Sequence, residues 1–280
     1  MNDINVYKIK RLSKKVLLYC ILIAIAIFMI GPFLWLLSTS IKPPGNIYDF
    51  PPQIIPNPIT FDSYIGVVQQ MDFMRYFMNS VFITFFGVVL NSIFSSMAAY
   101  PLARIDFPGK KVIFVAIIST MLLPNTSGLI VNFLTMQKLQ LVNTRVAVFL
   151  PSAVTVFGIF LLRQTYLTIP SELEDAARID GASEFGIWWR IMLPLVKPGL
   201  LTLIIFDFVA HWNTFLWPLI VLQDSEKYPL AAGLEYLQGA FSYNFRYIAA
   251  GTVISMIPMI IVFLIFQKQF IKGVAGAVKG

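Results

Sequence analysis

The sequence is poor in the residues on which soluble proteins and most enzymes depend. Charged residues make up only 12% of the 280 positions, whereas a soluble domain carries roughly 25%. Because so few charges cannot cover the surface of a soluble fold, and 58% of the residues are hydrophobic, lipid must be the solvent for much of the chain. One cysteine and one histidine exclude a disulfide framework and a Cys/His metal site, and they supply no cluster for a membrane enzyme.

Long apolar stretches are what the sequence has instead. A helix needs about 20 apolar residues to cross a bilayer, and the first stretch, which contains no charge, is too long to be the core of a signal peptide. Residues 124–128 interrupt the third stretch, which leaves open a kinked outer half and a helix lying on the membrane surface. The predicted spans are residues 16–37, 78–102, 112–133, 146–166, 199–222 and 247–268.

The basic residues predict which ends of these spans lie inside the cell. With the N-terminus inside, fifteen of the 21 Lys and Arg residues fall in inside segments, as the positive-inside rule requires. The six others are Lys42, Arg75, Lys138, Arg145, Lys227 and Arg246. The net charge of +7 is then a signal of topology rather than of nucleic-acid binding. We therefore predict an all-α integral membrane protein with six transmembrane helices, both termini inside, a permease domain at 16–272 and cytoplasmic tails at 1–15 and 273–280.

Two predicted outside segments differ in character. Residues 39–76 contain a cluster of prolines, which predicts an extended loop. Residues 223–246 are amphipathic and rich in aromatic residues, which is typical of a helix at the outer interface or of a loop that contacts an external partner. The candidates for such a contact are Leu234, Tyr236, Leu237 and Tyr243.

The inside loop at residues 168–197 carries the signals of a short capped helix. Ser171 is the predicted N-cap, and Glu174, three residues later, would complete a capping box. Gly181 fits the left-handed position that ends a helix. A helix of this length is marginal alone, and Leu173, Ala176 and Ala177 give it a face that another backbone can approach. A second short helix with Phe185, Trp188 and Trp189 is predicted to follow.

Three elements of this loop resemble the cytoplasmic signature of ATP-binding-cassette (ABC) importer permeases: Asp175-Ala176-Ala177, then Gly181, then Ile191-Met192-Leu193-Pro194. The spacing is intact, and Asp175 stands where Glu is usual. The run at residues 176–183, the aromatic segment at 212–219 and the end of the chain are similar to the carbohydrate-uptake branch, specifically to the maltose-permease G-type subunit. Thr214 stands where that branch commonly has an acidic residue.

The resemblance implies a permease of a prokaryotic inner or plasma membrane that works with several partners. These are a second, F-type permease, a homodimeric ATPase that binds ATP and Mg, and an extracytoplasmic binding protein that delivers a sugar and contacts the outer segment. The chain itself is expected to bind no cofactor, because residues 109–111 lack the glycine and hydroxyl of a phosphate loop. The implied ATPase-coupling residues are Glu174, Asp175, Ala176, Ala177, Asp180, Gly181, Ile191, Leu193 and Pro194.

Polar residues inside the predicted fifth span mark a candidate substrate path. Asp207 is costly in lipid unless it faces a cavity or a partner, and His211 and Thr214 follow it on the same helical face. Aromatic rings and amides near it suit a sugar, although an Asp–His pair that locks helix packing explains the same residues. The path candidates are Asp207, His211, Trp212, Asn213, Thr214 and Trp217.

Two further features bear on function. Span two carries a stripe of small and hydroxyl residues that indicates close helix packing; its members are Ser80, Thr84, Gly87, Asn91, Ser95 and Ala98. A secondary transporter, the main rival class, would need an ion-coupling site and internal repeats, and only the Asp207–His211 pair resembles the former.

Overall fold

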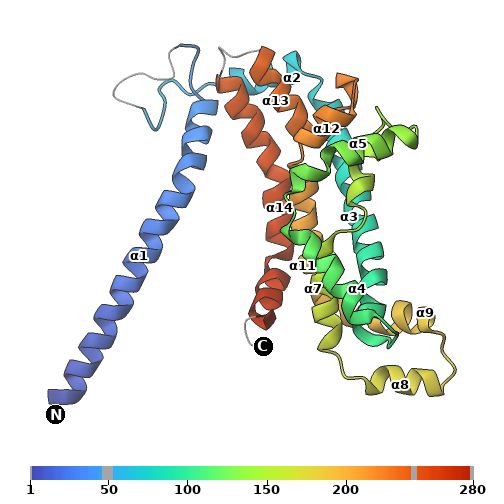
Figure 1. Ribbon diagram of the computed structural model, residues 1–280. Coiled ribbons are helices and arrows are strands. Elements are labelled where there is room, and N and C mark those ends of the chain that lie inside the picture. The colour runs from blue at the N-terminus through green and yellow to red at the C-terminus, as the bar shows by residue number, and fades with distance from the viewer. Residues whose placement is uncertain (1, 46–52, 241–244, 278–280) are drawn as a thin grey trace. The chain divides into compact units, whose positions relative to one another are not determined.

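The computed structural model describes residues 2–45, 53–240 and 245–277, and this part of the chain is helical, with no strand (Figure 1). The predicted all-α class is therefore confirmed for the described residues. The fold consists of two compact units, one formed by residues up to 70 with 245–254, and the other by residues 71–240 with those from 255 onward.

The first unit contains α1 (Asn2–Ser40), α2 (Asp62–Gln70) and the start of α14 (Phe245–Ala277). The apolar side chains of α1 are mostly exposed, as suits a helix in lipid. The prediction of an extended loop over residues 39–76 is wrong in part, because α2 occupies its second half. Ser40 and Tyr64 tie α1 to α2 through a hydroxyl–hydroxyl hydrogen bond of 2.7 Å.

Three helices are each long and apolar enough to cross a membrane, namely α1, α14 and α3 (Phe73–Arg104). Three bent helix pairs bring the number of candidates among the described residues to as many as six. The predicted spans 16–37, 78–102 and 247–268 fall inside the continuous helices. The other three predicted spans are broken, each for a local reason.

The third predicted span bends by 99° where the sequence indicated an interruption. Leu123 is extended, as expected before Pro124, because a proline excludes the helical conformation of the preceding residue. The helices on the two sides are α4 (Lys110–Ser119) with η1 (Thr120–Leu122), and η2 (Asn125–Gly128) with α5 (Leu129–Lys138).

The fourth predicted span bends by 45°, and Thr155 is the reason. Thr155 is extended and caps a new helix, because its hydroxyl accepts from the backbone N–H of Gly158 at 3.0 Å. The elements are α6 (Arg145–Phe149), η3 (Leu150–Ser152) and α7 (Val156–Leu167).

A single helix over residues 199–222 is a wrong prediction. Helix α11 (Lys197–Trp212) ends before the short helix α12 (Leu216–Val221) begins. Pro218 accounts for the break, because it has no N–H and its ring would clash with the carbonyl of Thr214 in a continuous helix.

Helix α3 is the spine of the second unit, and it packs against α7 and α11 (Figure 1). Its Ile83 belongs to one apolar core, shared with α6 and α12, whereas Ala99 and Ala103 belong to another, shared with α7 and the loop that follows it. Between the two cores, about halfway along α3, Gly87 and Asn91 form part of a polar layer. The candidate path and the candidate coupling loop are positioned by this layered arrangement.

Candidate functional site

The loop helix α8 (Glu172–Ile179) begins after Ser171 and ends as predicted, but without the predicted capping hydrogen bond. Gly181 has a φ of +80°, and the chain closes with the N–H of Ala182 on the carbonyl of Ala177 and that of Gly181 on Arg178, both at 3.0 Å. This is a Schellman ending. The capping box is a wrong prediction, because the Ser171 side chain makes no cap hydrogen bond. Glu174 does not turn back to Ser171 because it is held elsewhere.

A buried ion pair holds α8 against the end of α3. Glu174 is only 2% exposed, and its carboxylate accepts from the guanidinium of Arg104 at 2.5 Å. Arg104 also donates to the carbonyl of Ile169 at 2.9 Å. Because a buried carboxylate needs a partner and Arg104 provides one, the loop is fastened to a residue 70 positions earlier.

Arg178 extends this clamp to the next helix, α9 (Glu184–Ile187). It lies 3.5 Å from Glu174 and donates to Asp175 at 3.0 Å and to Glu184 at 2.7 Å. The hydrogen bond from Arg178 lowers the pKa of Glu184, so that this carboxylate stays ionised at neutral pH and the pair is lost only as pH falls through that lowered pKa. Tyr100 of α3 donates to the same carboxylate at 2.9 Å.

The other face of α8 is open. Ile179 is 87% exposed, and Leu173, Ala176 and Phe185 are exposed beside it. Ala177 lies on the opposite side, buried in the apolar core of the unit. The two neighbouring alanines, which the sequence placed on one docking face, therefore point about 100° apart around the helix, one outward and one into the core.

The residues of the predicted signature connect this loop to α11. A π-helical turn, η4 (Trp188–Met192), and α10 (Leu193–Leu195) lead into α11 with a bend of 78°. Trp188 is buried and donates to Ser96 of α3 at 3.1 Å, whereas Trp189 is exposed. Ile191 and Leu193 pack against the apolar core, and Pro194 is exposed.

Four of the six candidate path residues line a cavity of about 360 Å³ beside the polar layer. Asp207, His211, Thr214 and Trp217 line it, as do Asn132 of α5 and Ser152 and Thr155 of the bend between α6 and α7. The predicted face is thus brought together although its helix ends at Trp212, because the turn after α11 keeps Thr214 on the same side.

His211 lies at the centre of the polar layer to which Gly87 and Asn91 of α3 belong. Its Nδ1 lies 2.9 Å from the carbonyl oxygen and 3.3 Å from the carboxylate of Asp207, and its Nε2 lies 2.9 Å from the hydroxyl of Ser152. Both Asp207 atoms are acceptors, so Nδ1 carries a proton and donates. The Oδ2 atom of Asp207 is buried and has no hydrogen-bond partner within the described structure.

Two other path candidates lie elsewhere. Trp212 points away from the cavity, because its indole donates to the carbonyl of Ser255 at 2.9 Å and its ring stacks on Phe208. Asn213 donates to the carbonyl of Val209 at 2.9 Å and lines a second cavity of about 270 Å³. The second cavity shares Thr214 and Trp217 with the first, so the two adjoin.

The stripe of small residues on α3 packs as predicted and also caps other elements. The side chain of Asn91 accepts the N–H of Thr155 at 2.9 Å at the start of α7. Ser80 accepts the N–H of Leu230 at 2.7 Å, where α13 (Leu230–Ala240) begins. At Gly87 there is room for a hydrogen only, because an added Cβ would overlap the ring of His211.

Of the four residues predicted to contact an external partner, the structure describes the side chain of one. Leu234 of α13 is buried, so it is not on the surface of this unit. The side chains of Tyr236 and Leu237, and all of Tyr243, lie outside the described residues.

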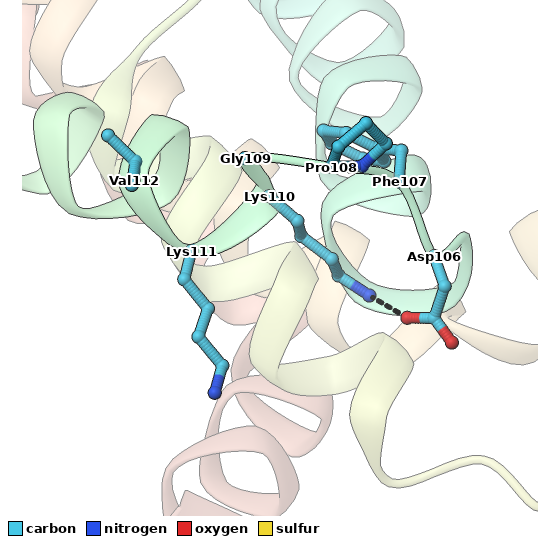
Figure 2. A pocket seen from close by; sticks show the side chains of 7 residues that line it. All are labelled: Asp106, Phe107, Pro108, Gly109, Lys110, Lys111 and Val112. Atoms are coloured by element: carbon cyan, nitrogen blue, oxygen red, sulfur yellow. Dashed lines mark hydrogen bonds and ion pairs between the residues drawn. The ribbon is translucent and has the colours of Figure 1, made fainter.

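The turn between α3 and α4 encloses an open cavity of about 610 Å³, lined by residues 106–112 alone. Figure 2 shows Lys110 reaching back to Asp106, at 3.3 Å, and Lys111 pointing away. Lys110 also donates to the carbonyl of Ala103 at 3.3 Å. With Lys110 bound within the turn, nothing in the cavity converges on a ligand.

Three functional candidates were missed by sequence reasoning. Arg104 counted only as one inside charge, and Ser152 and Asn132 passed as polar residues within predicted spans. An amide in an apolar stretch is a usable signal, but the pairing of Arg104 with Glu174 spans 70 residues and has no local signal.

Relatives of the chain are sugar transport permeases by name. It is 38% identical to the arabinooligosaccharides transport system permease protein AraQ of Halalkalibacterium halodurans, over 91% of this chain and 93% of AraQ. It is 30% identical to the lactose transport system permease protein LacG of Rhizobium radiobacter, over 97% of this chain and 98% of LacG.

A solved structure shares the fold. One chain of a bacterial ABC transporter involved in the import of the acidic polysaccharide alginate superposes with a TM-score of 0.79 at 30% identity, covering 91% of this chain and 95% of that chain. The family model described as "binding-protein-dependent transport system inner membrane component" matches residues 91–276. The chain therefore belongs to this family of ABC importer permeases, whose members are transmembrane subunits that leave ATP hydrolysis to a separate ATPase.

Proposed function

We propose that this chain forms, with a second, F-type permease, the translocation path of an importer for a sugar or oligosaccharide. An extracytoplasmic binding protein delivers the sugar, and a homodimeric ATPase, which carries the ATP and Mg, drives transport. The substrate class rests on the relatives whose names specify arabinooligosaccharides and lactose.

The proposed topology has six spans in the cell membrane of a prokaryote: the continuous helices α1, α3 and α14, and the broken segments at residues 112–133, 146–166 and 199–222. Both tails (1–15 and 273–280) lie inside, as does the loop at 168–197, because fifteen of the 21 basic residues then fall on that side. The segment around α13 lies outside, where Tyr236, Leu237 and Tyr243 remain candidates for contact with the binding protein.

One observation carries the coupling role. The face of α8 that holds Leu173, Ala176 and Ile179 is exposed and apolar, although it belongs to a loop outside the spans. An exposed apolar patch of this kind marks a protein interaction site. We assign this face, with Asp175, Asp180 and Gly181, to the ATPase. Glu174 and Ala177 act from behind, by fixing α8 to the membrane unit.

The substrate path is assigned to the cavity at the middle of α3. Asp207, His211, Thr214 and Trp217 line it, and Asn213 lines its neighbour. A site near the bilayer midplane is where alternating access exposes a substrate to either side. The tight fit of His211 against Gly87 is also what the alternative predicts, in which Asp207 and His211 only lock helix packing.

Reconstitution tests the function as a whole. The four kinds of subunit would be co-purified and placed in proteoliposomes. Uptake would be measured with a labelled neutral oligosaccharide that the binding protein binds. We expect uptake to require ATP inside the proteoliposomes and to require the binding protein. Uptake driven by an ion gradient without ATP would contradict the proposal and favour a secondary transporter.

The two alanines of α8 test the docking face. Ala176→Arg adds bulk and charge to the exposed face, so we expect a chain with unchanged thermal unfolding in which uptake is lost while ATP hydrolysis persists or the ATPase dissociates. Ala177→Arg is the matched contrast: it forces a charge into the core, which costs several kcal/mol, and should lower the unfolding temperature. Normal coupled uptake in Ala176→Arg would remove α8 from the interface.

A further inference from the structure

The cavity beside the polar layer is lined by polar groups that have no hydrogen-bond partner in the described chain. The amide of Asn132 and the hydroxyl of Thr214 line it, and neither side chain hydrogen-bonds to the part of the protein that the structure describes. Trp217 forms a fixed wall, because its indole N–H donates to the carbonyl of Ala147 at 3.0 Å. The three groups come from α5, from the turn after α11 and from α12.

This set of groups suits a sugar ring. An amide offers donors and an acceptor, and a hydroxyl offers both, so together they match vicinal sugar hydroxyls. A fixed aromatic wall with a few placed polar groups is typical of small-molecule sites, and 360 Å³ is at the small end of their range of about 300–1,000 Å³. The cavity therefore has room for a short part of an oligosaccharide.

The charge of the cavity restricts which sugar it can take. Asp207 is the one carboxylate among the residues that line it, and no lysine or arginine is found among them. His211 is already engaged by Asp207 and Ser152. A uronate carboxylate entering here would meet a like charge at low dielectric without a cation to pair with it. A neutral sugar meets an acceptor instead, since Asp207 Oδ2 has no partner within the described structure.

We propose that this cavity is a subsite for a neutral sugar ring, held by Asn132 and Thr214 against Trp217, and that Asp207 excludes uronates from it. The proposal rests on the sugar-import function proposed above and adds a binding residue, Asn132, and a substrate class. It also predicts a difference from the alginate importer of similar fold, whose substrate is an acidic polysaccharide.

Protection of a cysteine in the cavity measures binding without the selectivity of the binding protein. The complete transporter would carry Cys20→Ala and Ala210→Cys, because Ala210 lines the cavity and is small. The rate of labelling by a permeant maleimide would be measured with arabinotriose, lactose and raffinose as neutral probes and trigalacturonate as the acidic one. We expect at least one neutral probe to slow labelling and trigalacturonate to have no effect.

Three variants identify the groups responsible. Asn132→Ala removes a half-buried amide without internal partners, so the chain should fold and protection should weaken by about tenfold, the effect of one lost hydrogen bond. Gln137→Ala, on the exposed side of the same helix, is the control and should leave protection unchanged. Asp207→Asn should admit trigalacturonate.

The outcomes separate the subsite from the proposed function. No protection by any neutral probe, in a transporter with ATP-driven uptake of one of them, would overturn the subsite alone. Equal protection by neutral and acidic probes in the parent protein would overturn the role of Asp207. Protection in a preparation that lacks ATP-driven uptake would support the subsite and count against the proposed function.

Discussion

Replacing Glu174 by leucine is expected to release α8 from the membrane unit and to abolish coupled uptake. The substitution leaves Arg104 buried, with its side chain only 10% exposed, and without its carboxylate. Removing one partner of a buried ion pair costs roughly 3–5 kcal/mol, which corresponds to about two to four orders of magnitude in the opening of the loop. The measurement is hydrogen exchange of the amides of α8 in the membrane-embedded complex, together with ATP-driven uptake.

Two matched variants give this prediction its control. Glu172→Leu changes a carboxylate on the same helix that is exposed and makes no ion pair within the described structure, and it should leave both measurements near the parent values. The double variant Arg104→Leu/Glu174→Leu replaces both charges by apolar groups, which is often neutral for stability. It should restore the protection of α8. If Glu174→Leu behaves like Glu172→Leu, the ion pair does not hold the loop.

The clamp also explains how motion of α8 would reach the membrane. Glu174 fixes α8 to α3, Arg178 fixes it to Glu184, and Tyr100 of α3 binds the same Glu184. The loop and the C-terminal end of α3 are therefore joined at two places, so a force applied at the exposed face of α8 is passed to the spine of the second unit as well as along the chain into α11.

The parts of this architecture that depend on local rules were predictable from the sequence. The scarcity of charge identified a membrane protein, and Gly181 identified the end of α8, because its left-handed conformation favours glycine. The i, i+4, i+7 spacing of Asp207, His211 and Thr214 placed three residues on one cavity. These features need only composition, helical periodicity or a single backbone conformation.

The parts that depend on distant partners were not. The capping box failed because Arg104, far away in sequence, binds Glu174 more strongly than a backbone N–H near the helix start would. The sequence predicted that Ala177 is a docking residue like Ala176, but the core of the unit buries its side chain. Asn132 was not predicted as a site residue, because it belongs to a site only through the opposite wall of the cavity, which α11 and α12 build. Pro218 is a sequence signal for the break at residues 213–215, but the apolar stretch around it favoured one long helix.

Gly87→Ala is the substitution with the largest expected effect on the cavity. A methyl group at this position would overlap the ring of His211, and overpacking of a dense interior costs about 1–3 kcal/mol. The ring would have to leave Asp207 and Ser152, so we expect uptake to fall below detection and the unfolding temperature to drop. Gly31→Ala, in α1 where an added Cβ meets nothing within 4 Å, controls for the gain in helix propensity.

The double variant Gly87→Ala/His211→Ala separates the two explanations of the Asp207–His211 pair. Truncating His211 makes room for the methyl group, so the unfolding temperature should recover, with a coupling energy of about 1–3 kcal/mol in the double-mutant cycle. Recovery of stability without recovery of uptake would mean that the imidazole serves the path itself. Recovery of both would mean that the pair only locks α3 against α11, because the packing of the methyl group would then replace the imidazole without loss of uptake. Equal behaviour of Gly87→Ala and Gly31→Ala would contradict the tight packing from which both explanations start.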